Sequence, residues 1–220
     1  MTVRSKTHKL TLMAMFAALA YIIMTVGRIP ISSVPFLKYD PKDAILVIGS
    51  FILGPMPGLL ITTAVCLIEM ITVSDTGIIG MIMNLLGSAA FVCPAATIYR
   101  KKHTISGAVT GLVIGSLIMT ALMLLWNYFI TPYYMGYPRE AVAAMLLPHF
   151  LPFNLIKAGL NLAVTLFIYK PVSKALKRAG LVESTPGSTA PKKSVLGVSL
   201  IALVVLVSCI FAVLIIKGII

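Results

Sequence analysis

The chain has 220 residues, of which 59% are hydrophobic and 11% are charged, with a net charge of +12. Soluble domains average about 45–50% apolar residues, so the composition excludes an ordinary soluble protein and predicts an integral membrane protein in a lipid bilayer. Because the basic residues cluster between apolar runs, we attribute the positive charge to membrane topology and predict no nucleic-acid partner.

The apolar runs predict membrane-spanning helices. The first run follows a basic N-terminus but lacks a small-residue cleavage site, so we interpret it as a retained span and not as a signal peptide. The second and third runs are separated by Gly54-Pro-Met-Pro-Gly58, a composition typical of a tight turn between two short helices. The predicted spans are 10–27, 43–54, 58–73, 78–99, 106–130, 148–169 and 195–216.

The predicted fold is therefore an all-α integral membrane protein, a six-helix bundle with a seventh, C-terminal transmembrane helix. We predict a membrane domain over residues 1–178, a flexible cytoplasmic linker over 179–194 and the additional helix over 195–217, because Ser, Thr, Pro and Gly dominate the middle segment. The three cysteines, Cys66, Cys93 and Cys209, lie in apolar runs, so no disulfide framework is expected.

The distribution of basic residues predicts the orientation of the chain. With the N-terminus in the cytoplasm, 12 of the 18 lysines and arginines lie in inner segments, five lie in outer segments, and Lys157 lies within a span. The outer five are Arg28, Lys38, Lys42, Arg139 and Lys217. An excess of Lys and Arg in cytoplasmic loops is the usual topology signal.

Lys157 is the most informative residue, because it interrupts an otherwise apolar span. Asn154 stands three residues before it and Asn161 four residues after it, so at helical spacing all three share one face. A cation inside a membrane costs several kcal/mol unless it is hydrated or paired. This face is therefore predicted to border a polar cavity.

Other polar residues lie toward the same side of the membrane. Asn127, Glu69 and Asn84 are each predicted to lie in the outer halves of their spans, whereas the inner halves are almost wholly apolar. This pattern predicts a binding pocket that opens outward and is closed toward the cytoplasm, not a continuous pore.

Structural roles are alternatives for several of these side chains. Asn84 and Asn161 can hold neighbouring helices together, and Glu69 can simply pair with Lys157. Asp43 directly precedes an apolar run and can cap its helix, while Lys157 can extend to the outer interface.

Two predicted outer loops, 28–42 and 131–147, combine aromatic residues with proline and are candidate lids. Proline keeps a lid stiff and lowers the entropy cost of closing on a ligand. Tyr39, between a lysine and an aspartate, is predicted to contact ligand. Tyr133, Tyr134 and Tyr137 are either ligand contacts or members of an interfacial aromatic belt.

Three segments then point to a family. They are Phe36-Leu-Lys-Tyr-Asp-Pro-Lys-Asp43, Trp126-Asn-Tyr-Phe129 with Thr131-Pro-Tyr-Tyr134, and Pro152-Phe-Asn-Leu-Ile-Lys157. In combination and in order they resemble the riboflavin-specific substrate-binding (S) component of bacterial energy-coupling-factor (ECF) transporters, over about residues 8–178. The family's flavin contacts match Tyr39, Asn127, Asn154 and Lys157. The resemblance implies six helices, so the run 195–216 departs from it.

The resemblance also implies function and partners. An S component in the bacterial cell membrane binds riboflavin near the outer face as its transported ligand, with no cofactor. It docks on a transmembrane T component driven by two ATPase subunits. This chain has no G-x-x-x-x-G-K-[ST] motif of its own. In the family a face of small residues meets the T component, and the pattern Ala14-x-x-x-Ala18 matches it. Gly111-x-x-x-Gly115 has the same form, which internal packing also explains.

The residue chemistry fits riboflavin. The pyrimidine edge of the flavin has carbonyl acceptors and an N–H donor, which asparagine amides can pair in both directions. Lys157 suits its electron-rich side. We expect Asp40, Asp43, Glu69 and Asn84 to serve the ribityl hydroxyls, and the phosphate of FMN to be disfavoured by these carboxylates. Apolar walls are expected from Phe36, Leu37, Trp126, Tyr128 and Phe153.

The sequence leaves three other functions as alternatives. An intramembrane enzyme is disfavoured because His8, His103 and His149 are widely separated and no Gly-x-Ser-x-Gly elbow occurs. A self-sufficient facilitator is disfavoured by the apolar inner halves of the spans. An S component for another vitamin, such as thiamine, is the alternative within the family.

Overall fold

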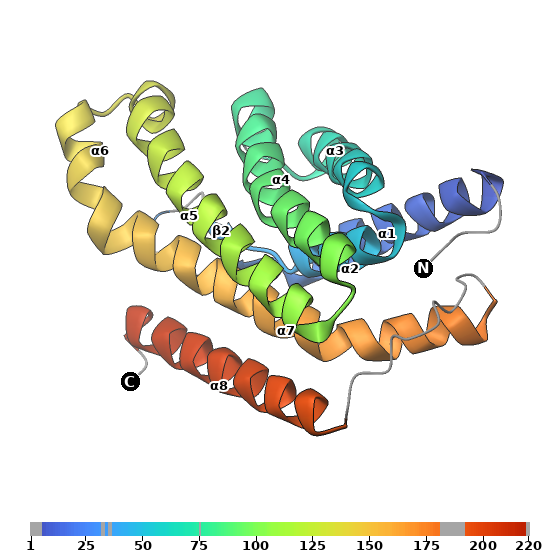
Figure 1. Ribbon diagram of the computed structural model, residues 1–220. Coiled ribbons are helices and arrows are strands. Elements are labelled where there is room, and N and C mark those ends of the chain that lie inside the picture. The colour runs from blue at the N-terminus through green and yellow to red at the C-terminus, as the bar shows by residue number, and fades with distance from the viewer. Residues whose placement is uncertain (1–5, 32–33, 35–36, 75, 181–191, 219–220) are drawn as a thin grey trace.

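The computed structural model describes residues 6–31, 34, 37–74, 76–180 and 192–218 (Figure 1). Over these residues the chain is almost wholly helical, which confirms the all-α prediction. The helices are α1 (Lys6–Gly27), α2 (Lys42–Leu53), α3 (Pro55–Thr72), α4 (Gly77–Lys102), α5 (Ile105–Met135), α6 (Arg139–Met145), the short π-helix η1 (Leu146–Phe150), α7 (Leu151–Arg178) and α8 (Lys192–Ile216).

Helix α2 is the centre of the bundle. It contacts α1, α3, α4 and α7, and every residue from Lys42 to Ile52 is buried. Its 12 residues extend about 18 Å at about 1.5 Å per residue, which is too short for a bilayer core of about 30 Å. By length and composition, six other helical segments of the described chain can cross a membrane, α8 among them.

The predicted pair of helices around residue 54 is confirmed, but the turn between them has fewer residues than expected. Gly54 alone breaks the chain, with φ of +105°, and Pro55 already opens α3. Proline is tolerated in the first turn of a helix because its missing N–H would have no partner there. The prediction that α3 begins at residue 58 is therefore wrong by one turn.

The prediction that residues 131–147 form a lid loop is also wrong, because most of this segment is helical. Helix α5 continues through Pro132 to Met135 and ends at Gly136, which adopts a left-handed conformation with φ of +67°. Helix α6 and η1 then lead directly into α7. Proline within a membrane helix is tolerated where neighbouring groups satisfy the freed backbone, so Pro132 does not end α5.

The first candidate lid, residues 28–42, contains two short strands that pair with each other. Strands β1 (Ile29–Pro30) and β2 (Lys38–Tyr39) pair antiparallel, with Ile29 opposite Tyr39. This ladder was not predicted from the sequence. Most of the proposed linker, 181–191, and Phe36 lie outside the described residues, so the division into domains stays a prediction. The run 195–216 lies within α8, which packs along α7 (Figure 1).

Small residues allow the helix backbones to approach closely. A Cβ added at Gly111 would lie 2.8 Å from the carbonyl oxygen of Ala95, and one at Gly115 would lie 2.5 Å from that of Phe91. Both glycines therefore face α4, and internal packing explains the Gly111-x-x-x-Gly115 pattern. Between α7 and α8, a Cβ at Gly159 would lie 2.7 Å from Cys209 Sγ.

The α4–α5 contact yields a stability prediction. Gly115→Ala should lower the free energy of unfolding by about 1–3 kcal/mol, because overpacking forces the two backbones apart. The measurement is the melting temperature of the purified protein in detergent. Gly197→Ala on α8 is the control, since an added Cβ there meets nothing within 4 Å. A Gly115→Ala protein that melts no lower than wild type would contradict the predicted packing.

Candidate functional site

Buried and half-buried charges gather at one end of the bundle, where α1 and α3 end and α2 begins. Three are cations and three are carboxylates, and they are connected by ion pairs across the α1–α2 segment, α2, α3 and α7. The six residues are Arg28, Asp40, Lys42, Asp43, Glu69 and Lys157. We call them the charge network. Its formal charges balance to zero.

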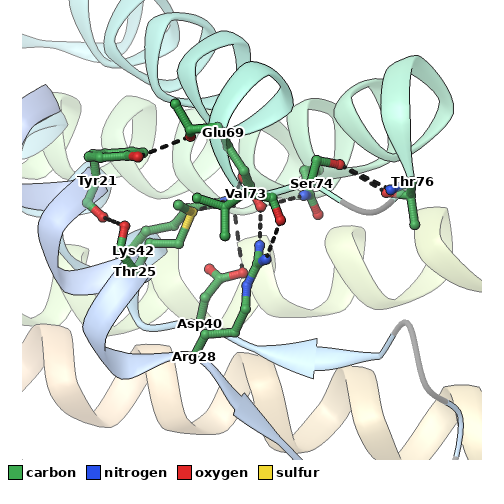
Figure 2. A network of polar contacts seen from close by, with 12 residues as sticks. Tyr21, Thr25, Arg28, Asp40, Lys42, Glu69, Val73, Ser74 and Thr76 are labelled. Atoms are coloured by element: carbon green, nitrogen blue, oxygen red, sulfur yellow. Dashed lines mark hydrogen bonds and ion pairs between the residues drawn. The ribbon is translucent and has the colours of Figure 1, made fainter.

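Glu69 on α3 is the first centre of this network (Figure 2). Its carboxylate forms ion pairs with Arg28 and Lys42, and it accepts a hydrogen bond of 3.0 Å from the Asn84 amide. The Lys42 side chain is fully buried, so its ammonium depends on these partners for compensation. Arg28 also donates to the carbonyl oxygen of Val73 at 3.5 Å, which ties the end of α1 to the end of α3.

Asp43 on α2 is the second centre. It accepts a hydrogen bond of 2.5 Å from Ser88 Oγ on α4 and one of 3.4 Å from the Asn161 amide on α7. Lys157 Nζ lies 3.7 Å from Asp43 and 3.9 Å from Asp40. Asp43 thus connects three helices from the first turn of α2.

Asp40 joins the two centres. Its Oδ2 atom lies 3.9 Å from both Lys42 Nζ and Lys157 Nζ. Burial acts to raise the pKa of Asp40, but the ammonium groups of Lys157 and Lys42 outweigh burial and hold that pKa below its usual range. The carboxylate is therefore charged and contributes to the balance of the network.

Cavities lie against the network. One of them, of about 360 Å³, is within the size range of ligand pockets, about 300–1,000 Å³. We call it the outer cavity. It is lined by Arg28, Lys38, Asp40, Glu69, Ser74, Thr76, Met83, Asn84, Tyr134 and Met135.

A smaller space, the amide cavity, adjoins it and shares Lys38, Met83 and Asn84 with it. Its remaining lining is Leu37, Gly87, Met119, Met123, Asn127, Phe153, Asn154 and Lys157. The amide cavity thus combines three carboxamides, of Asn84, Asn127 and Asn154, and two ammonium groups, of Lys38 and Lys157, with apolar walls. A third space, lined in part by Trp126, Ile130 and Tyr134, also borders Met83.

Comparison with known proteins places the chain in a family. The family model for the substrate-specific component of ECF transporters matches residues 8–169. The chain belongs to this family.

Relatives and a solved structure agree with the match. The chain is 27% identical to the "Riboflavin transporter RibU" of Staphylococcus aureus, over 79% of this chain and 94% of that protein. It is 28% identical to the "Riboflavin transporter FmnP" of Bacillus subtilis, over 69% of this chain and 85% of that protein. The solved S component of a bacterial ECF transporter superposes with a TM-score of 0.68 at 27% identity, over 79% of this chain and all of that one.

The predicted site residues of this S component fall into two groups. Asn127, Asn154 and Lys157 line the amide cavity, and Asp40, Glu69 and Asn84 line the outer cavity. Tyr39 and Asp43 are not among the described residues that line these spaces. Tyr39 is buried and donates a hydrogen bond of 3.3 Å to Asn161, which lies behind Lys157 on the same helix.

Hydrogen bonds to backbone carbonyl groups orient the side-chain amides of Asn127 and Asn154. Asn127 donates to the Met123 carbonyl oxygen at 2.6 Å, and Asn154 donates to that of Phe150 at 2.8 Å. The Asn127 oxygen also accepts from Thr131 at 2.8 Å. These bonds within α5 and from η1 to α7 fix the orientation of the two carboxamides.

Several sequence interpretations need correction. Lys157 borders a cavity as expected, but it is also accompanied by two carboxylates, those of Asp40 and Asp43, which were not predicted as its partners. Among the described residues, Glu69 forms its ion pairs with Arg28 and Lys42 and not with Lys157. Asp43 is not the helix cap, because α2 begins at Lys42 with no side-chain cap and Asp43 points into the bundle. Asn84 and Asn161 each form a hydrogen bond to a neighbouring helix, as the structural alternative expected. Asn84 also lines both cavities, and its contact with a ligand stays a prediction.

The sequence interpretation missed Arg28 and Lys42, which were counted as outer-loop charges. Lys42 immediately precedes Asp43, and a Lys–Asp pair at the start of an apolar helix was the available signal. Among the expected apolar walls, Leu37 and Phe153 line the amide cavity and Trp126 lines the third space. Tyr128 instead stacks edge-on with Phe129, with Arg139 above both rings.

The network predicts a large effect of removing one charge. Glu69→Gln should lower the free energy of unfolding by about 3–5 kcal/mol, because it leaves a buried ammonium and a guanidinium without their carboxylate. Thermal unfolding of the ligand-free protein in detergent measures this. Glu140→Gln, at an exposed position on α6, is the matched control. Equal melting of the two variants would show that Glu69 does not hold the network together.

Proposed function

We propose that this S component binds riboflavin in the joined cavities and supplies it to an ATP-driven ECF transporter. The observation that carries the proposal is the lining of the amide cavity. There Asn127, Asn154 and Lys157 face one space with Phe153 and methionine side chains around it. The names of the relatives as riboflavin transporters support the choice of vitamin.

The amide cavity suits the pyrimidine edge of a flavin. Each carboxamide offers one acceptor and two donors, and the ammonium group offers donors only. A flavin edge presents carbonyl acceptors together with one N–H donor, so the set is complementary. Methionine side chains and Phe153 supply polarisable and aromatic surface for the ring.

The balanced charge network favours an uncharged ligand. Lys157 is compensated by Asp40 and Asp43, so it does not require an anion to neutralise it. A phosphate group would add negative charge close to Asp40 and Glu69, which line the outer cavity. We therefore expect riboflavin to bind more tightly than FMN.

The proposed site has supporting residues behind it. Asp43 and Asp40 position the Lys157 ammonium, while Tyr39 and Asn161 hold the region where α2 and α7 meet. In this proposal Asn127, Asn154 and Lys157 contact the ring. Tyr39 and Asp43, predicted as ligand contacts, act by positioning them.

Partners and orientation belong to the same proposal. We infer a cytoplasmic N-terminus and a pocket that faces outside, from the distribution of Lys and Arg. The T component and two ATPase subunits supply the energy. Ala14 and Ala18 are exposed on α1, so small residues are available on that helix for close approach of a partner helix.

Binding can be tested directly on the purified protein. Wild type should copurify with, or take up, riboflavin, giving yellow colour and quenched flavin fluorescence. Lys157→Met and Asn154→Ala should each weaken binding by roughly 5- to 150-fold, since an unpaired buried polar group costs about 1–3 kcal/mol. Lys174→Met, at an exposed position on the same helix, should bind as wild type. Colourless protein that fails to bind added riboflavin would refute the proposal, and binding of thiamine instead would support the alternative vitamin.

Docking is tested by separating binding from transport. Ala14→Trp or Ala18→Trp should abolish riboflavin uptake by cells that depend on this transporter. Either substitution should leave binding to the purified protein unchanged, because the added indole lies on the exposed face of α1, away from the cavities. Ala64→Trp, an exposed alanine on α3, is the control for bulk alone. Uptake that survives both α1 substitutions would place the partner surface elsewhere.

A further inference from the structure

Helix α8 lies outside the family match, which ends at residue 169, and it packs along α7 through one stripe of side chains (Figure 1). The stripe is formed by Ala202, Leu206, Cys209 and Val213. Their spacing of three or four residues places them on one face of the helix. Ala202 is fully buried and the other three pack against buried side chains, whereas Val204 on the opposite face is 64% exposed. One face of α8 is therefore built into the bundle.

The stripe covers a buried apolar cluster that contributes to the amide cavity. The cluster is formed by the α1–α2 segment together with α6, η1 and α7. Leu206, Cys209 and Val213 pack against it from outside. Two of its members, Leu37 and Phe153, also line the amide cavity. These two side chains thus connect the cluster that α8 covers with the space proposed for the ligand.

A chain of polar contacts begins in the same cluster and ends at the cavity. Tyr39 is a member of the cluster, and its hydroxyl donates to Asn161 Oδ1 at 3.3 Å. The Asn161 amide donates to Asp43 Oδ2 at 3.4 Å, and Lys157 Nζ lies 3.7 Å from the same oxygen. Burial raises the pKa of the Tyr39 hydroxyl, and nearby acidic groups, the Cys209 thiol of α8 among them, act in the same direction. The hydroxyl therefore stays protonated and remains the donor at the start of this chain.

Gly159 determines how closely α8 approaches α7. A Cβ at this position would lie 2.7 Å from Cys209 Sγ, so any larger residue would force the two helices to shift. Gly159 follows Lys157 by two residues, and residues two apart point to different sides of a helix. The turn of α7 that presents Lys157 to the cavity is therefore supported from behind by Cys209.

We propose that α8 is an accessory helix of the binding site, which holds Tyr39, Leu37 and Phe153 in place from behind and thereby positions Lys157 for the ligand. Cys209 is its main positioning residue, and it acts through its size and not through thiol chemistry. The inference rests on the proposed function for the identity of the ligand. The family fold forms the cavities, and the additional helix determines how firmly their rear wall is held.

Added bulk on the stripe tests this role. Cys209→Phe should weaken riboflavin binding by the purified full chain by about 5- to 100-fold, the range that corresponds to the usual cost of overpacking a helix contact. Cys209→Ser keeps the size and should bind within about twofold of wild type. Val204→Phe adds the same ring on the exposed face of α8 and should bind as wild type. Affinities are measured by the quenching of flavin fluorescence.

A rescue experiment shows whether the effect passes through the α7–α8 contact. Gly159→Ala should weaken binding by about 2- to 10-fold, because its Cβ collides with Cys209 Sγ. Adding Cys209→Ala removes the sulfur and should restore binding to the wild-type level, although neither residue lines the amide cavity. This pair of variants decides the question if Cys209→Phe does not yield folded protein.

Hydrogen exchange gives a readout that needs no ligand. In the ligand-free protein, backbone amides of the segment 28–42 should exchange faster in Cys209→Phe than in wild type, because Tyr39 loses its support. Gly111→Ala strains the α4–α5 contact and reports the effect of destabilisation alone. It should leave both riboflavin binding and the exchange of this segment unchanged at temperatures below its melting transition.

The outcomes separate the accessory role from the proposed function. If Cys209→Phe binds riboflavin as wild type does, or if Val204→Phe weakens binding equally, α8 is only a membrane anchor and the inference is refuted. If Gly111→Ala weakens binding and speeds exchange as much as Cys209→Phe, α8 contributes stability alone and the inference is again refuted. If wild type binds no riboflavin, the proposed function fails, and the exchange of the segment 28–42 still decides whether α8 supports it.

Discussion

The fold depends on a buried helix that is too short to cross the membrane and carries charge at its start. Helix α2 contacts α1, α3, α4 and α7, and its first turn holds Lys42 and Asp43 inside the bundle. Isolated charges there would be prohibitive. They are tolerated because Glu69, from α3, and Lys157, from α7, complete a network without net charge. The packing of four helices around α2 therefore requires that its charges be paired, and the same packing brings their partners into place.

This constraint also shapes the proposed pocket. Since the ion pairs are satisfied within the protein, the cavity walls present an oriented set of polar groups without an excess of either sign. A neutral, polar, aromatic ligand fits such a site better than an ion does. The site residues come from the α1–α2 segment and from α3, α4, α5 and α7, so the pocket exists only when the bundle is assembled.

The additional helix α8 leaves the proposed partner surface accessible. It packs along α7, where Gly159 allows close approach of Cys209, whereas Ala14 and Ala18 are exposed on α1. The family match ends at residue 169, before α8 begins. The chain therefore carries an extra apolar helix beside the family fold without covering the face that we propose for docking.

The sequence by itself determined the membrane class, the helical runs and the gathering of polar residues toward one side, because hydropathy and helical spacing are local properties. It also determined that Asn154, Lys157 and Asn161 share a face. Only the tertiary structure decided how the charges pair. The Lys–Asp pair at the start of α2 marked Lys42 as unusual, but only the packing of α2 shows that its side chain is buried. Glu69 pairs with Lys42 and Arg28 and not with Lys157 because partner choice depends on how α1, α2 and α3 meet. The extension of α5 past Pro132 was likewise decided by contacts that no local pattern encodes.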